Sequence, residues 1–139
     1  MQHLRTFIIP ALLLAILSLS SCEKVEYFQS EKNVHSQLTG SWQLVPIPST
    51  KPLEEWTFNE DFVYRSVLIN GIMTPVDTST YSINTSLMKV VVVIDQFKLT
   101  LDELNGDWQV VQLNDNYLII ATDHYDSTGI LEREFTRVR

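Results

Sequence analysis

The sequence has 139 residues, of which 17 are acidic and 10 basic, so its formal net charge at pH 7 is −7. An acidic chain without a basic stripe cannot neutralise many phosphates, which argues against nucleic-acid binding and against electrostatic docking onto anionic lipid. A single cysteine excludes an intrachain disulfide.

The first 21 residues have the organisation of a secretory signal peptide. Arg5 supplies a positive charge, an apolar run follows over Phe7–Leu17, and Ser20 and Ser21 form a small-residue site. The apolar run is shorter than the roughly 20 residues that a transmembrane helix needs. We therefore predict that residues 1–21 are removed, which leaves 118 of the 139 residues, enough for one domain.

The only cysteine follows this segment directly. Leu19-Ser20-Ser21-Cys22 resembles the lipobox of bacterial lipoproteins, whose cysteine thiol receives a diacylglycerol and whose new amine is usually acylated, for example with palmitate. Cysteine suits this chemistry because its thiolate is a strong nucleophile near neutral pH. The alternative is an ordinary signal peptide with a chance cysteine behind it. We predict lipidation at Cys22, a tether over residues 22–29 and a domain over residues 30–139.

The residues after the cysteine bear on location. Glu23 and Lys24 resemble the charged starts of Bacteroidetes-type lipoproteins, in which such residues often direct display on the cell surface. The resemblance implies an outer-membrane protein held by acyl chains. Whether it lies on the surface or on the periplasmic face stays open.

The domain is predicted to open with a short helix and to continue as strands. Ser30 is a suitable N-cap for a helix over Glu31–Leu38, which Gly40 would stop. From Gly40 onward apolar residues alternate with polar ones, as in strands with one buried face. The predicted strands are Ser41–Val45, Glu54–Phe58, Phe62–Ile69, Thr80–Ile83, Met88–Ile94, Phe97–Asp102, Trp108–Leu113, Tyr117–Thr122 and Ile130–Val138.

Turn residues separate these runs, which favours hairpins between neighbouring strands. Asn-Gly pairs such as Asn70-Gly71 adopt the left-handed conformations of tight hairpin turns. Closing such a meander into a barrel removes its exposed edges. We therefore predict an all-β fold: an antiparallel up-and-down barrel of about eight short strands with a short N-terminal helix.

Three short motifs resemble the lipocalin-like domains of Bacteroidetes lipoproteins, over roughly residues 36–139. They are Gly40-x-Trp42 in the first strand, Trp56-Thr57-Phe58-Asn59 in the second, and Phe135-Thr136-Arg137-Val138 in the last. The resemblance implies that Trp42 plugs the closed end of the barrel and that Arg137 lies across its ring as a structural pair. It also implies a barrel that can hold a small apolar or amphipathic ligand.

Alternation along the last strand places Arg133 on the inner face with Arg137. Arg133 is then either the polar anchor for an anionic ligand in a wet barrel, or a residue at a rim or bulge. Several aromatic residues are expected to supply the inner surface, where core packing is the default interpretation and ligand lining the other. They are Trp42, Trp56, Phe58, Phe62, Tyr64, Phe97 and Trp108.

No catalytic constellation is visible. There is no G-x-S-x-G motif, no Cys–His pair after processing and no phosphate loop, so we expect neither an enzyme nor a cofactor. Asp123-His124-Tyr125-Asp126 is interpreted as a hairpin loop rather than a metal site, and no metal is expected. Asp126-Ser127-Thr128 resembles a short O-glycosylation acceptor, which leaves modification of Ser127 open.

The sequence is therefore compatible with two functions. The first is a lipid-anchored barrel that binds a small apolar or amphipathic ligand. The second is a non-enzymatic interaction or accessory subunit of an envelope complex, with a barrel filled by its own side chains. A large enclosed pocket would favour the first, whereas a filled interior with an exposed apolar patch would favour the second.

Overall fold

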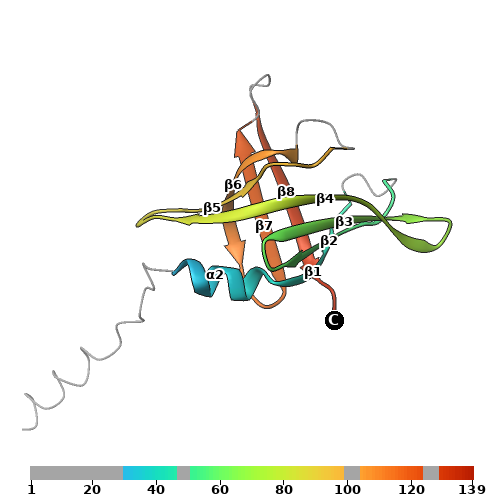
Figure 1. Ribbon diagram of the computed structural model, residues 1–139, viewed down its shortest axis with the longest axis horizontal. Coiled ribbons are helices and arrows are strands. Elements are labelled where there is room, and N and C mark those ends of the chain that lie inside the picture. Colours follow the sequence, from blue (N-terminus) through green and yellow to red (C-terminus); the bar gives the residue numbers. More distant parts are fainter. Residues whose placement is uncertain (1–29, 47–50, 99–103, 124–128) are drawn as a thin grey trace, which may run out of the picture.

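Eight antiparallel strands close a barrel in sequence order, preceded by one helix (Figure 1). The computed structural model describes residues 30–46, 51–98, 104–123 and 129–139. Their elements are α2 (Glu31–Leu38), β1 (Gly40–Leu44), β2 (Glu54–Asn59), β3 (Phe62–Ile69), β4 (Ile72–Thr85), β5 (Val90–Ile94), β6 (Gly106–Leu113), β7 (Tyr117–Asp123) and β8 (Ile130–Arg137). Since β1 also pairs with β8, the predicted up-and-down barrel is confirmed.

Helix α2 begins and ends as its sequence predicts. The Ser30 side chain accepts a hydrogen bond from the backbone N–H of Asn33 at 3.3 Å, which satisfies one of the free donors of the first turn. Val34 and Leu38 are fully buried against the barrel, and the backbone N–H of Thr39 closes the helix on His35. We call the end of the barrel next to α2 the helix end, and the opposite one the far end.

The hairpin between β3 and β4 is much longer than predicted. Asn70 and Gly71 form its turn, with φ values of 51° and 82°, so the predicted Asn-Gly turn is confirmed. The predicted strand Thr80–Ile83 is too short, because β4 pairs with β3 back to Ile72. The register shifts between Arg65 and Ser66, opposite Pro75, and a bulge is where a strand tolerates a residue without an N–H.

The prediction of a strand over Phe97–Asp102 is wrong where the structure describes it. Phe97 and Lys98 are irregular, and residues 99–102 lie outside the described part of the chain. The cause is Asn105, whose side-chain oxygen accepts from the backbone N–H of Phe97 at 2.9 Å and whose amide donates to its carbonyl at 3.0 Å. One side chain thus occupies both backbone groups that a strand partner would use.

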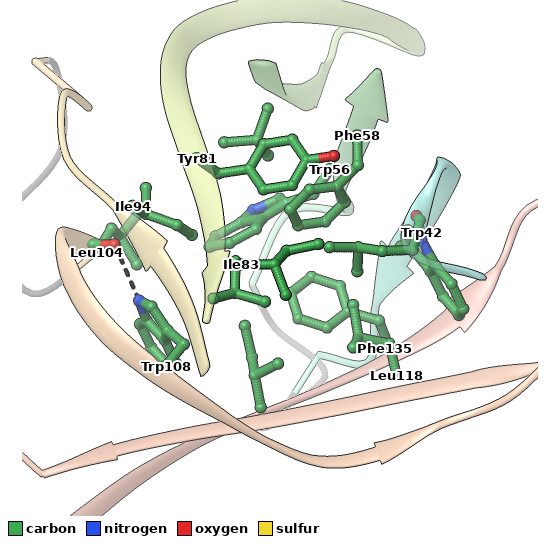
Figure 2. Close-up of a cluster of buried hydrophobic side chains, with 14 of the residues drawn as sticks. Trp42, Trp56, Phe58, Tyr81, Ile83, Ile94, Leu104, Trp108, Leu118 and Phe135 are labelled. Atoms are coloured by element: carbon green, nitrogen blue, oxygen red, sulfur yellow. Dashed lines mark hydrogen bonds between the residues drawn. The ribbon is translucent and has the colours of Figure 1, made fainter. Parts of the chain in front are cut away.

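Inward-facing side chains from every strand form one continuous core (Figure 2). The cluster comprises Val34, Leu38, Trp42, Trp56, Phe58, Val63, Tyr81, Ile83, Val92, Ile94, Phe97, Leu104, Trp108, Leu118, Ile120 and Phe135. Trp108 Nε1 donates to the carbonyl of Leu104 at 3.1 Å, so its indole N–H is satisfied in the core.

Candidate functional site

A tryptophan and an arginine close the helix end. The guanidinium carbon of Arg137 lies 4.0 Å from the ring centroid of Trp42, which is fully buried. Arg137 also donates to two backbone carbonyls at the end of α2, Thr39 at 3.0 Å and Gln37. Trp42 Nε1 donates to the carbonyl of Leu38 at 2.7 Å. This contact ties β1, β8 and the helix together, and is the arrangement that the resemblance implies for the pair.

A cluster of charged side chains faces the interior of the barrel toward its far end. The carboxylate of Glu54 accepts hydrogen bonds from Nε of Arg65 at 2.8 Å and from Nη2 of Arg65 at 3.0 Å, which makes a bidentate ion pair. It also accepts a hydrogen bond from Nε1 of Trp56 at 2.7 Å. The guanidinium carbon of Arg133 lies 5.8 Å from the ring centroid of Trp56 and 5.9 Å from that of Trp108. We call Glu54, Arg65 and Arg133 the inner polar layer.

The strand register explains why these charges face the interior. Trp56 pairs with Arg65, and β2 alternates so that Glu54 shares the inner face with Trp56. Burial by itself would raise the pKa of Glu54. The hydrogen bonds from Arg65 and Trp56 and the positive charges of Arg65 and Arg133 outweigh it, so the pKa lies below its ordinary value of 4.5. Arg133 therefore acts electrostatically on the Glu54–Arg65 pair.

Five of the seven aromatic residues expected to supply the inner surface do lie in it, namely Trp42, Trp56, Phe58, Phe97 and Trp108. Trp56, Phe58 and Phe97 are at most 4 % exposed. The ring centroid of Trp56 lies 6.4 Å from that of Phe58, 5.5 Å from that of Phe97 and 5.2 Å from that of Phe135. The rings of Trp56, Phe58 and Phe135 lie next to one another in the interior of the barrel (Figure 2).

The placement of Tyr64 and Phe62 is corrected. Tyr64 pairs with Thr57 on the outer face and is 38 % exposed, and Phe62 is 42 % exposed. Their ring centroids lie 6.4 Å apart on the outside of the barrel. The prediction counted aromatic residues as inner without following the alternation of β3, which turns Val63 and Arg65 inward instead.

The sequence interpretation missed the Glu54–Arg65 pair, although a signal for it was present. Val63, Arg65 and Val67 alternate with outward residues in a strand whose bounds were predicted correctly. An arginine at an inner position calls for a carboxylate on a neighbouring strand. Glu54 begins the predicted strand Glu54–Phe58, but the sequence interpretation assigned it no basic partner.

The other candidate chemistry does not come together in the described residues. His35 bonds through Nε2 to the carbonyl of Glu60 at 2.8 Å and stacks on Tyr81, while His124 and Ser127 lie outside the described part. No group of three or more His, Cys, Asp and Glu that could hold a metal occurs in the described ranges.

A hollow on the surface of the molecule lies outside the barrel. An open hollow of about 450 Å³ beside Ser30, Glu31, Lys32 and His35 lies on the helix, away from the inner polar layer. Among the described helices none is long and apolar enough to cross a membrane. Cys22 and the signal-peptide residues fall outside the described ranges.

Comparison with known proteins adds no relative. A scan against protein-family models finds no match, and searches of the curated proteins and of the solved structures find none either.

Proposed function

We propose that this chain is a lipid-anchored, non-enzymatic lipoprotein of the bacterial outer membrane whose barrel serves as an interaction module rather than a container. Its N-terminal pattern supports the first half of the proposal: a signal peptide followed by Leu19-Ser20-Ser21-Cys22, with palmitate-type acyl chains on Cys22. Its likeness to lipocalin-like lipoprotein domains supports the same assignment. The barrel itself supports the second half.

The observation that carries the interaction module is the packed interior. Between Trp42 at the helix end and the Glu54–Arg65 pair toward the far end, buried side chains contact one another in a single cluster. Other apolar side chains are exposed on the outside of the barrel. The β3–β4 hairpin reaches beyond the rest of the sheet (Figure 1) and carries Leu68, Ile69 and Ile72, which are 37 %, 46 % and 69 % exposed.

Native mass spectrometry of the chain from Glu23 to Arg139, purified without detergent, tests this reading of the barrel. That chain keeps every contact described here, since the described domain begins at Ser30. We expect the bare polypeptide mass, with no shift across a panel of lipids and hydrophobic cofactors. A reproducible extra mass that is lost on unfolding would contradict the interaction module.

The anchor needs a separate test. Metabolic labelling with an alkyne analogue of palmitate should mark the wild-type protein and not a Cys22→Ser variant. If the wild-type protein takes up no label, the proposed lipid anchor is wrong, whereas the proposed interaction role of the barrel is unaffected.

A ligand carrier is the second candidate, and Arg133 is the observation that favours it. Its guanidinium lies close to two indole rings at the far end, a setting that suits the anionic head of an amphipathic molecule. If native mass spectrometry shows an extra mass that disappears in Arg133→Ala and persists in Arg139→Ala, the carrier replaces the interaction module.

A further inference from the structure

The turn between β4 and β5 exposes two large apolar side chains. Leu87 is 67 % exposed and Met88 is 94 % exposed. The other described hairpin turns are built from polar residues and glycine, as turn conformations favour: Glu60-Asp61, Asn70-Gly71 and Asn114-Asp115-Asn116. Leucine and methionine bring no such advantage to a turn, so their presence at this tip calls for another cause.

The turn is held without them. The backbone N–H of Ser86 donates to the carbonyl of Lys89 at 2.9 Å, and the Ser86 hydroxyl donates to the same carbonyl at 3.1 Å. The backbone N–H of Lys89 in turn donates to the Ser86 hydroxyl oxygen at 3.2 Å. Ser86 and Lys89 thus fix the conformation, and the two residues between them are presented to the surroundings on a rigid support.

This tip projects from the helix end. His35 in α2 stacks on Tyr81 in β4, with ring centroids 6.0 Å apart. From Tyr81 the strand runs on to Thr85, and a strand rises about 3.3 Å per residue, so the tip lies beyond the helix. Figure 1 shows the start of α2 and the β4–β5 turn on the same, left-hand side of the molecule.

The lipid anchor would join the domain on that same side. The described domain starts at Ser30, eight residues after Cys22. Eight residues, even fully extended, reach at most about 28 Å. Acyl chains on Cys22 would therefore keep the start of α2, and with it the side that carries the β4–β5 turn, within a short distance of the bilayer.

We propose that Leu87 and Met88 insert into the interfacial region of the membrane that holds the acyl chains, with the exposed Lys89 at the level of the lipid phosphates. This inference rests on the proposed lipidation of Cys22. The driving force is burial of apolar side chains rather than net charge, because the chain as a whole is acidic. Two anchor points in place of one fix the orientation, so the far end and the β3–β4 hairpin point away from the membrane.

Spin labels on the lipidated full-length protein test the orientation. Cys22 is consumed by the lipid, so Met88→Cys provides a single free thiol for a nitroxide, and Ile72→Cys is the matched control. Ile72 is likewise apolar, 69 % exposed and next to a hairpin turn, but at the far end. Both proteins are reconstituted in vesicles of phosphatidylethanolamine and phosphatidylglycerol, and collisions with oxygen and with a water-soluble nickel chelate are measured.

We expect the label at position 88 to lose collisions with the nickel chelate severalfold relative to the label at position 72. Adding Leu87→Ser should restore part of that loss. Equal exposure of both labels to the nickel chelate, in protein that floats with the vesicles, overturns the insertion of this turn and leaves the lipid anchor intact. A protein without acyl mass on Cys22 that does not float overturns the anchor and the insertion together.

Discussion

Arg137 lies over the ring of Trp42, its guanidinium carbon 4.0 Å from the ring centroid, and caps the end of α2 with the same side chain. The contact links the last strand to the first and to the helix that precedes it. A residue of the last strand therefore holds the helix at the start of the described domain against the barrel that β1 and β8 close.

Replacing Arg137 with Ala should destabilise the domain by about 2–4 kcal/mol, since it removes a cation–π contact and hydrogen bonds from a charged donor to two carbonyls. Arg137→Lys should recover only part, because an ammonium cannot reproduce the guanidinium fork. Urea unfolding followed by tryptophan fluorescence measures both. Arg139→Ala is the control: this exposed arginine bonds only to the Asn116 side chain among the described contacts, and its loss should cost under about 0.5 kcal/mol. Equal effects at both positions would contradict the role of Arg137.

Gly40 is predicted to tolerate no side chain. Its φ is +123°, and a Cβ there would lie 2.9 Å from Nη1 of Arg137. Gly40→Ala should therefore cost about 1–3 kcal/mol from backbone strain alone, with a further loss as Arg137 is displaced from Trp42. Gly71→Ala separates the two effects, because Gly71 also has a positive φ, +82°, but open space around it. Thermal unfolding should rank wild type first, Gly71→Ala second and Gly40→Ala last; the reverse order of the two variants would count against the contact.

The sequence predicted the fold well because its signals were local. Asn70-Gly71 specified a turn, Ser30 a helix start, and alternation the strands on either side. The predicted strands were wrong where a contact with residues outside the segment determined its conformation. Asn105 binds both backbone groups of Phe97 and prevents a strand that the alternation of residues 97–102 favoured. Pro75 concealed the first half of β4, because a bulge that tolerates it depends on pairing with β3.

The inner polar layer was only half predictable. Alternation along β8 placed Arg133 inside, and the same rule applied to β3 would have placed Arg65 there and Tyr64 outside. Which carboxylate meets which arginine depends on the register between β2 and β3, which aligns Trp56 with Arg65. Register follows from packing of the whole sheet, so no single segment contains it.

Replacing Phe58 with Ala should cost about 3–5 kcal/mol, since a fully packed ring leaves a cavity behind. Tyr64→Ala should cost far less, because Tyr64 lies on the outer face and is 38 % exposed. Chemical unfolding of the two variants compares an inner and an outer aromatic position six residues apart. Comparable losses would show that Tyr64 is packed in the interior after all.

The Glu54–Arg65 pair makes stability depend on pH in the acid range. The pKa of Glu54 in the folded protein lies below its ordinary value of 4.5, so the unfolded chain binds a proton more readily than the folded one. The stabilisation is fully present above about pH 4.5, and it is lost as the pH falls through the lower folded-state pKa.

Glu54→Gln should therefore flatten the acid limb of a stability-against-pH curve. At pH 7 it should also cost about 2–4 kcal/mol, because Arg65 loses its carboxylate in a site where the two side chains are only 19 % and 12 % exposed. The neighbouring Glu55→Gln, on the opposite face of the strand, is the matched control for the change of charge. Wild type and Glu54→Gln with parallel curves between pH 2 and pH 7 would mean that this carboxylate is not held in its charged form by the interior of the barrel.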